Sequence, residues 1–143
     1  MNINETLKHY FGYDSLRPGQ QELMEGILQR KDVLGIMPTG AGKSLCYQVP
    51  ALMLDGITIV VSPLISLMTD QVKALNQTGV HAAYINSSLT ENQIRTALFY
   101  AAQGRYKIIY VAPERLNTMQ FLDFACHAEI AMVTVDEAHC ICL

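Results

Sequence analysis

The sequence predicts an α/β fold in which a parallel sheet is covered by helices on both faces. Apolar stretches alternate with amphipathic ones along the 143 residues, a pattern typical of a doubly wound fold. Several strand candidates are continuous and β-branched, as in residues 57–61 and 107–111, which suits strands buried on both faces. A glycine-rich turn also joins one strand candidate to a helical pattern. We expect strands at residues 32–37, 58–61, 81–85, 107–112 and 130–135.

The helix patterns between these strands have recognisable ends. Arg17 and Pro18 open the first helix, and Ser62 can cap a later one with Pro63 at its first position. That later helix carries one apolar stripe, formed by Leu64, Leu67, Met68, Val72 and Leu75.

Two further signals concern helix boundaries. Thr90 and Gln93 form a capping box, with Leu89 and Ile94 placed as a hydrophobic staple. Pro50 should kink or stop the helix that follows the glycine-rich turn.

Composition narrows the class of protein. The chain is 50% hydrophobic and 16% charged, with no repeat or linker, which indicates one globular domain over residues 1–143. No apolar run reaches the ~18 residues of a membrane span, and the first eight residues are not a secretory signal. The net charge of -3 argues against a general polyanion-binding surface but allows a local groove.

The four cysteines show no Cys-x-x-Cys spacing, and a reducing cytoplasm fits them better than a disulfide scaffold. A zinc site at His139, Cys140 and Cys142 is the weaker interpretation, since structural zinc ligands usually come in paired clusters.

The glycine-rich turn at residues 37–44 predicts a phosphate-binding loop. A turn between a strand and a helix presents successive backbone N–H groups to an anion, and a lysine adds a full charge. Lys43 would reach the β- and γ-phosphates of a nucleotide, and the Ser44 hydroxyl would ligate Mg²⁺. The remaining ATP-binding candidates in the loop are Thr39, Gly40, Ala41 and Gly42. Met37 stands where the general pattern has its first glycine.

A pair of acids follows the last strand candidate. Asp136 and Glu137 come directly after residues 130–135, which places two carboxylates at the carboxyl edge of the sheet. Asp136 can hold Mg²⁺ through water, and Glu137 can orient or deprotonate the attacking water. Such a pair alone is usually a solvated turn. Together with the phosphate loop, it predicts nucleotide hydrolysis, with Lys43, Asp136 and Glu137 as catalytic candidates.

A third group lies upstream of the loop. Gln20 offers an amide donor and acceptor, the pair that an adenine edge requires. Tyr13 could stack on the base, and Arg17 could add a cation above it. A surface turn with a helix cap is the competing interpretation.

Five ordered stretches closely resemble the N-terminal RecA-like half of RecQ-family DNA helicases of superfamily 2. They resemble the adenine motif and motifs I, Ia, Ib and II, at residues 11–20, 37–51, 61–72, 110–116 and 136–140. The resemblance implies a RecA-like P-loop NTPase sheet and a motor that uses ATP and Mg²⁺. Such a motor moves 3′ to 5′ on single-stranded or partly duplex DNA in recombination and repair. The location implied is cytoplasmic and nucleoid-associated.

The resemblance also implies DNA contacts from motifs Ia and Ib. Ser62 and Ser66 have hydroxyls suited to phosphate oxygens, and N–H groups at the helix start near Pro63 could bind phosphate without a basic surface. Arg115 is the nearest basic candidate, although a surface salt bridge fits it equally well. His139 would relay between nucleotide and DNA, unless it is a plain structural histidine.

The chain stops at Leu143, shortly after motif II, whereas the family continues. We expect a partial RecA-like domain that lacks motif III, the second RecA-like half needed in cis, the zinc module and the winged helix. The motif III strand would lie between the motif I and motif II strands. Its absence predicts unpaired backbone, exposed apolar faces and poor folding of the chain alone. The alternative function is a nucleotide- or DNA-binding module without turnover, and an RNA helicase is a weaker third.

Overall fold

A computed structural model describes residues 1–37 and 42–138 of the chain. The chain divides into two compact units, Met1–Asp55 and the part from Gly56 onward, and each is described here by itself. No helix in the described ranges is long and apolar enough to span a membrane.

The first unit is helical. It contains α1 (Ile3–Thr6), the π-helical turn η1 (Leu7–Phe11), α2 (Gln20–Leu28) and α3 (Leu45–Met53). Leu7, Met24 and Val49 form its small buried core, one from each of three helical segments. The predicted helix after Arg17 and Pro18 is confirmed, and its first residue is Gln20.

The predicted strand at residues 32–37 is wrong. These residues have no regular secondary structure, and Leu34 and Ile36 are 81% and 89% exposed. The segment passes close to α2, since a Cβ placed on Gly35 would lie 2.8 Å from Leu23 Cδ1. An apolar run becomes a strand only when another strand supplies hydrogen-bond partners. None of the described strands pairs with residues 32–37.

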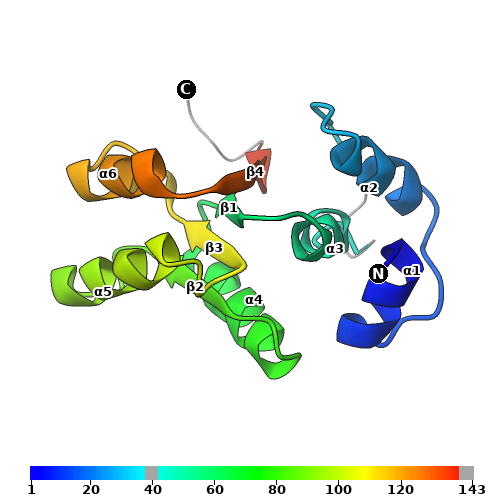
Figure 1. Cartoon of the computed structure of the whole chain (residues 1–143), viewed down its shortest axis with the longest axis horizontal. Helices are drawn as coiled ribbons and strands as arrows, with labels where there is room; N and C mark the ends of the chain where they lie inside the picture. The colour runs from blue at the N-terminus through cyan, green and yellow to red at the C-terminus, as the bar shows by residue number, and fades with distance from the viewer. Residues whose placement is uncertain (38–41, 139–143) are drawn as a thin grey trace. The chain divides into compact units, whose positions relative to one another are not determined.

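The second unit carries a parallel sheet of four described strands in the order β2-β3-β1-β4 (Figure 1). The strands are β1 (Ile57–Val61), β2 (Ala82–Ile85), β3 (Ile108–Val111) and β4 (Ile130–Val135). All three pairings are parallel, which confirms the predicted α/β class. Gly56, with φ of +98°, allows β4 to approach, because a Cβ there would lie 2.6 Å from the Glu129 carbonyl oxygen.

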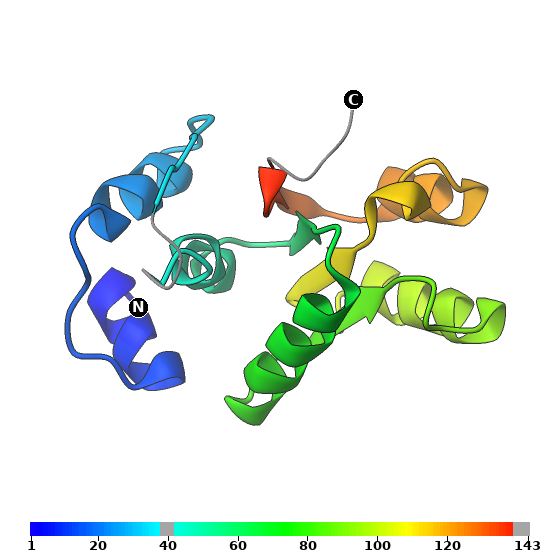
Figure 2. The ribbon, with the colours of Figure 1, turned by 180° about the vertical axis from the view of Figure 1, so that it is seen from behind.

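Helices cover both faces of this sheet (Figures 1 and 2). On one face, β1 residues Ile57, Ile59 and Val61 pack with α5 (Glu91–Ala102) and α6 (Met119–His127) in the main hydrophobic core. On the other face lies α4 (Ile65–Gln77), whose Met68, Val72 and Leu75 are buried. β1 and β3 are buried on both faces, which explains why these two strands read as continuous apolar runs.

Helix starts and stops follow the predictions in part. The Thr90 capping box is confirmed: Thr90 Oγ1 accepts from Gln93 N at 3.2 Å, and Gln93 Oε1 accepts from Thr90 N at 2.9 Å. Pro50 lies inside α3 but does not stop it, because the helix continues to Met53 and Leu54 N donates to Pro50 O at 3.0 Å. The other predicted effect, a kink at Pro50, stays a prediction.

The predicted cap of α4 is also wrong. The helix begins at Ile65, its N-cap is Leu64, and no side chain caps it. Ser62 instead extends the sheet, where its N–H donates to Val111 O at 3.1 Å. That hydrogen bond keeps Ser62 in strand geometry, so the helix starts two residues later.

Candidate functional site

The phosphate-loop candidates lie in the first unit, at the start of α3. Gly42 has a φ of +75°, which favours glycine, and its carbonyl oxygen accepts from Leu45 N at 3.1 Å. Lys43 and Ser44 are half-buried in the turn before the helix. Ser44 is the N-cap residue of α3, so the loop ends where helix N–H groups begin to point outward.

Gln20 connects the adenine-motif candidates to the phosphate loop. Its side chain is 1% exposed, and its Nε2 donates to Gly42 O at 3.0 Å. Its Oε1 accepts from Arg17 N at 2.7 Å. A Cβ on Gly42 would lie 2.7 Å from Gln20 Nε2, so only glycine leaves room for this contact. Gln20 therefore braces the loop, a role that its sequence pattern did not reveal.

A pair of sulfur atoms spans the same loop. Cys46 Sγ in α3 lies 3.6 Å from Met37 Sδ, the last described residue before the loop. Burial raises the pKa of the Cys46 thiol, so it remains protonated and can donate its weak S–H to the methionine. This contact ties the two legs of the loop together.

Tyr13 and Arg17, the other adenine candidates, are exposed in the segment between η1 and α2. Arg17 lies next to Gln20 in the structure as well, because Gln20 N donates to Arg17 O at 3.2 Å. Base stacking by these two side chains stays a prediction.

The second unit gathers its candidates at the carboxyl edge of the sheet. The strand ends lie level, since Val61 is in register with Val135 and with Val111, and Val111 with Ile85. The residues that follow these ends stand in one row: Asn86, Ala112, Ser62 and Asp136. Three of the sequence motifs therefore reach the same edge, where ligands bind in open parallel sheets.

Asp136 and Glu137 close the end of β4. Asp136 is 8% exposed, its N–H donates to Val61 O at 2.9 Å, and its Oδ1 accepts from Glu137 N at 3.0 Å. Glu137 has a φ of +54°, a left-handed conformation that costs a residue with a Cβ roughly 1–2 kcal/mol. The chain thus turns sharply at Glu137, the predicted catalytic base. Asp136 stays within the hydrogen-bond ladder of the strands.

The DNA candidates Ser62 and Ser66 differ in environment. Ser62 is 1% exposed, and its Oγ accepts from Leu64 N at 3.4 Å. Ser66 is exposed in the first turn of α4, beside N–H groups that no side chain caps. Of the two hydroxyls, that of Ser66 is open to a phosphate.

Arg115 forms an ion pair, as its competing interpretation anticipated. It lies in the short 3-10 helix η2 (Pro113–Arg115) after β3, and its Nη1 is 3.4 Å from Glu91 Oε1 at the start of α5. Sequence reasoning gave no role to Glu91 or to Asn86. Asn86 is fully buried, donates to Met68 Sδ at 3.6 Å, and accepts from Ser88 N at 2.9 Å. Asn86 thereby ties the end of β2 to α4.

Four predicted site residues lie outside the described residues: Thr39, Gly40, Ala41 and His139. The weaker zinc candidates Cys140 and Cys142 lie outside them as well.

The donor atoms present suit the expected cofactors. Asp136 and Ser44 offer carboxylate and hydroxyl oxygens, the ligands that Mg²⁺ prefers, although they belong to different units. Gly42 and the start of α3 supply the glycine backbone and helix N-terminus that suit nucleotide phosphates. Catalytic roles for Lys43, Asp136 and Glu137 stay predictions.

Comparison with known proteins gives one family and several relatives. A family model described as DEAD/DEAH box helicase matches residues 17–142. The chain is 49% identical over 136 residues to the ATP-dependent DNA helicase RecQ of Bacillus subtilis, covering 94% of this chain and 23% of that protein. Those of Haemophilus influenzae and Pasteurella multocida are 46% and 47% identical, covering 95% and 96% of this chain and 22% of each relative. The chain thus spans under a quarter of the length of these relatives.

Proposed function

Because the chain belongs to the DEAD/DEAH box helicase family, we propose that it is part of an ATP-driven DNA helicase motor of the RecQ type. The similarity to three RecQ proteins supports DNA rather than RNA as the substrate. The proposed activity is ATP hydrolysis coupled to 3′-to-5′ movement on single-stranded DNA and to duplex unwinding, in a cytoplasmic, nucleoid-associated protein.

The observation that carries this proposal is the row of residues at the carboxyl edge of the sheet. Ser62 follows β1, Asp136 follows β4, and Arg115 lies just beyond the end of β3. On this proposal, nucleotide chemistry after β4 and nucleic-acid contact after β1 and β3 occur at the ends of neighbouring strands of one sheet. A change at Asp136 can reach Ser62 directly, because the N–H of Asp136 bonds to the residue before Ser62.

The role proposed for each residue follows from the chemistry of its side chain or backbone groups. Lys43 and the N–H groups at the start of α3 would bind the β- and γ-phosphates, and Ser44 and Asp136 would each offer an oxygen ligand to Mg²⁺. Glu137 orients or deprotonates the attacking water. A second RecA-like half supplied in cis would complete the cleft with an arginine finger. By itself, this chain would then bind nucleotide with little or no turnover.

The first experiment is Mg·ATP titration calorimetry on the chain and on Lys43→Ala. We expect binding by the chain and at least about a tenfold loss of affinity in the variant, because the lysine charge contacts phosphate. Equal affinity in both proteins would remove Lys43 and the loop from the proposed site.

The second experiment compares Glu137→Gln with the parent residue in a full-length helicase that contains this chain. The variant should bind Mg·ATP normally and lose turnover, since glutamine keeps the size of the side chain but cannot accept a proton. Undiminished hydrolysis would exclude Glu137 as the base. An unwinding assay on the unmodified full-length helicase distinguishes the two substrates. If that protein unwinds RNA duplexes but not DNA duplexes, the RNA helicase alternative replaces the DNA helicase.

A further inference from the structure

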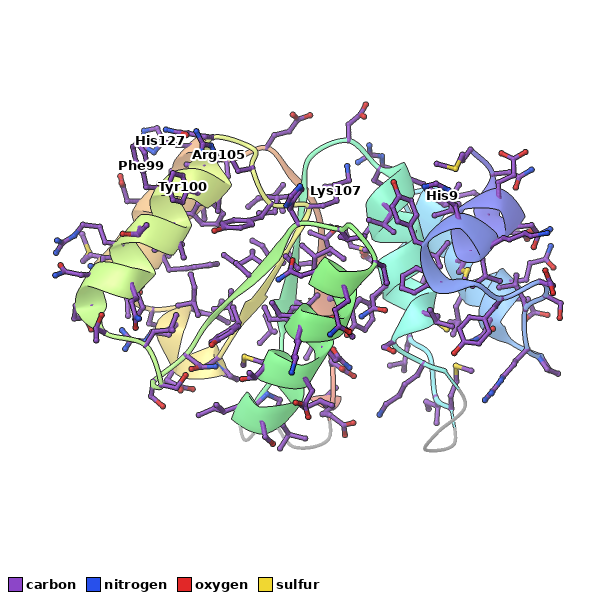
Figure 3. All side chains as sticks on the ribbon, turned by 90° about the horizontal axis from the view of Figure 1, so that it is seen from below. His9, Phe99, Tyr100, Arg105, Lys107 and His127 are labelled. Atoms are coloured by element: carbon purple, nitrogen blue, oxygen red, sulfur yellow. The ribbon has the colours of Figure 1, made fainter. Side chains whose placement is uncertain are left out.

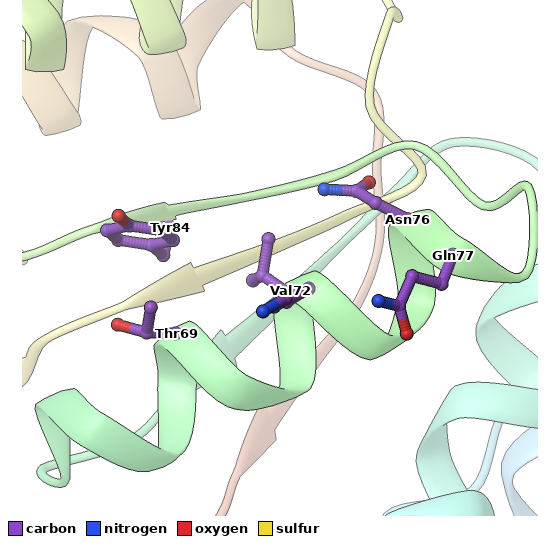
Figure 4. Close-up of a pocket in the computed structure, with 6 residues that line it drawn as sticks. Thr69, Val72, Asn76, Gln77 and Tyr84 are labelled. Carbon is purple, nitrogen blue, oxygen red and sulfur yellow. The ribbon is translucent and has the colours of Figure 1, made fainter.

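Two hollows flank the outer edge of β2, the strand at one end of the described sheet order. One has a volume of about 410 Å³ and lies between β2 and α4 (Figure 4). Its lining residues are Thr69, Val72, Lys73, Asn76, Gln77 and Tyr84. The other has a volume of about 480 Å³ and reaches α5, where Leu89, Gln93, Ala97 and Tyr100 line it. Both hollows include Val72, Asn76 and Tyr84, so they meet across the strand edge.

The backbone of β2 turns alternate residues toward this edge. Ile85 faces β3, because its carbonyl oxygen accepts from Ala112 N at 3.0 Å. Alternate residues of a strand direct their backbone groups to opposite sides, so Ala83 also faces β3 while Ala82 and Tyr84 face outward. The Ala82 N–H confirms this orientation, since it donates to the Asn76 side chain at 2.9 Å. Tyr84 therefore presents both an N–H and a C=O group to the outside.

The edge of this strand is short and partly covered, because β2 has four residues and the Asn76 side chain occupies the Ala82 N–H, but its backbone turns outward again at Tyr84. Its four residues, Ala-Ala-Tyr-Ile, include no charge and no proline. They pair with β3 in a constant register from Ala82 to Ile85. Such an edge can accept another extended backbone.

We propose that the β2 edge binds an extended segment of a partner protein, which adds to the sheet as one more strand. An added strand directs successive side chains to opposite faces. One side chain would enter the hollow beside α4 and the next the hollow beside α5, which is the arrangement by which strand addition gains both affinity and specificity.

The lining chemistry defines the partner. Among the residues that line the two hollows, Lys73 is the one with a charged side chain, and it lies on the α4 side. The α5 side is lined by Leu89, Ala97 and tyrosine rings, among them Tyr100 (Figure 3), together with the uncharged polar side chains of Asn92, Gln93 and Thr96. The partner segment therefore alternates an acidic or amide side chain, facing Lys73, with an apolar one, facing α5.

Lysine 73 is exposed, whereas Val72 beside it is buried. The charge of Lys73 can thus be reversed without disturbing the core, which gives a variant that keeps the fold. Tyr84→Pro removes the outward N–H at an edge strand, where proline is tolerated, and Tyr84→Phe keeps both the ring and the N–H.

The test is selection from a displayed library of random octapeptides on a full-length helicase that contains this chain. We expect enriched peptides that alternate acidic or amide residues with apolar ones. Their affinity should fall at least about tenfold in Tyr84→Pro, which lacks both one backbone hydrogen bond to the peptide and the ring that lines the two hollows, and stay unchanged in Tyr84→Phe. Hydrogen exchange of the Tyr84 amide should slow when peptide binds.

The charge variant keeps the proposal falsifiable even if Tyr84→Pro does not fold. Selection on Lys73→Glu should enrich lysine or arginine in place of the acidic residue, whereas Lys31→Glu, a charge reversal in the first unit, should give the parent pattern. Absence of enrichment overturns the proposal, as do peptides that bind Lys73→Glu and the parent chain alike. Self-association lost in Tyr84→Pro, without peptide binding, would assign the edge to a second copy of this chain instead.

Discussion

Gln20 shows how one side chain can have two separable roles. Its amide holds Gly42 O and Arg17 N, whereas its predicted role is to recognise adenine. Gln20→Ala removes both, and Gln20→Glu keeps the acceptor for Arg17 N but removes the donor to Gly42 O. If Gln20 braces the loop, both variants should weaken ATP and GTP binding alike, by about tenfold.

The measurement is nucleotide titration with ATP and GTP for each variant, with Gln21→Ala as a control at an exposed neighbour. A loss confined to ATP would show that Gln20 reads the base and that the contact with Gly42 contributes little.

Thr58 offers a test of stability at the same scale. Its Oγ1 is buried in β1 and has no hydrogen-bond partner among the described residues. Thr58→Val replaces that hydroxyl with a methyl group of similar size, so the variant should be more stable by about 1 kcal/mol. Urea denaturation of the two proteins measures the difference. Thr58→Val being less stable would indicate that the hydroxyl has a partner in the folded chain.

Individual residues were predictable where a local rule fixes them. The Thr90 capping box and the position of Asp136 after an apolar strand follow from short spacings that sequence displays directly. The bonds of Gln20 to Gly42 and of Arg115 to Glu91 join residues more than twenty positions apart. No periodicity reports such pairs, because tertiary folding alone brings them together.

At the scale of elements, the cap of α5 gives a prediction with a matched control. Thr90→Ala removes the acceptor for Gln93 N and should destabilise the chain by about 1 kcal/mol. Thr90→Ser keeps the hydroxyl and should stay close to the parent. Thermal or urea unfolding of the three proteins checks the order, and equal stability of Thr90→Ala and the parent would deny the cap any net contribution.

A comparison of the predicted and observed strands and helices shows which elements could be predicted from the sequence and which could not. Four strands were anticipated to within one residue at each end, because short continuous apolar runs between helical patterns have few other stable placements. Residues 32–37 show the same apolar character but no strand, since pairing depends on a neighbour rather than on composition. The helix α6 went unanticipated, although Thr118 caps it by accepting from Phe121 N at 3.3 Å.

For the whole molecule, exposed apolar surface governs the expected behaviour. Val133 and Val135 on β4 are 59% and 49% exposed, and Leu34 and Ile36 in the first unit are more exposed still. Apolar surface on a strand at the end of a sheet, such as β4, promotes association. We therefore expect a shallow urea transition, and light scattering that grows with protein concentration. Val133→Lys should reduce the scattering. A steep, cooperative transition with an m-value of about 1–3 kcal/mol/M would contradict the expectation of poor folding.

The strand order has a consequence for synthesis on the ribosome. β1 sits between β3 and β4, yet its partners follow it by roughly 50 and 75 residues in the chain. At about 5–20 residues per second, β1 waits several seconds before either neighbour emerges. During that interval, its four apolar residues are exposed, which makes the nascent chain a natural client for chaperones that hold extended hydrophobic segments.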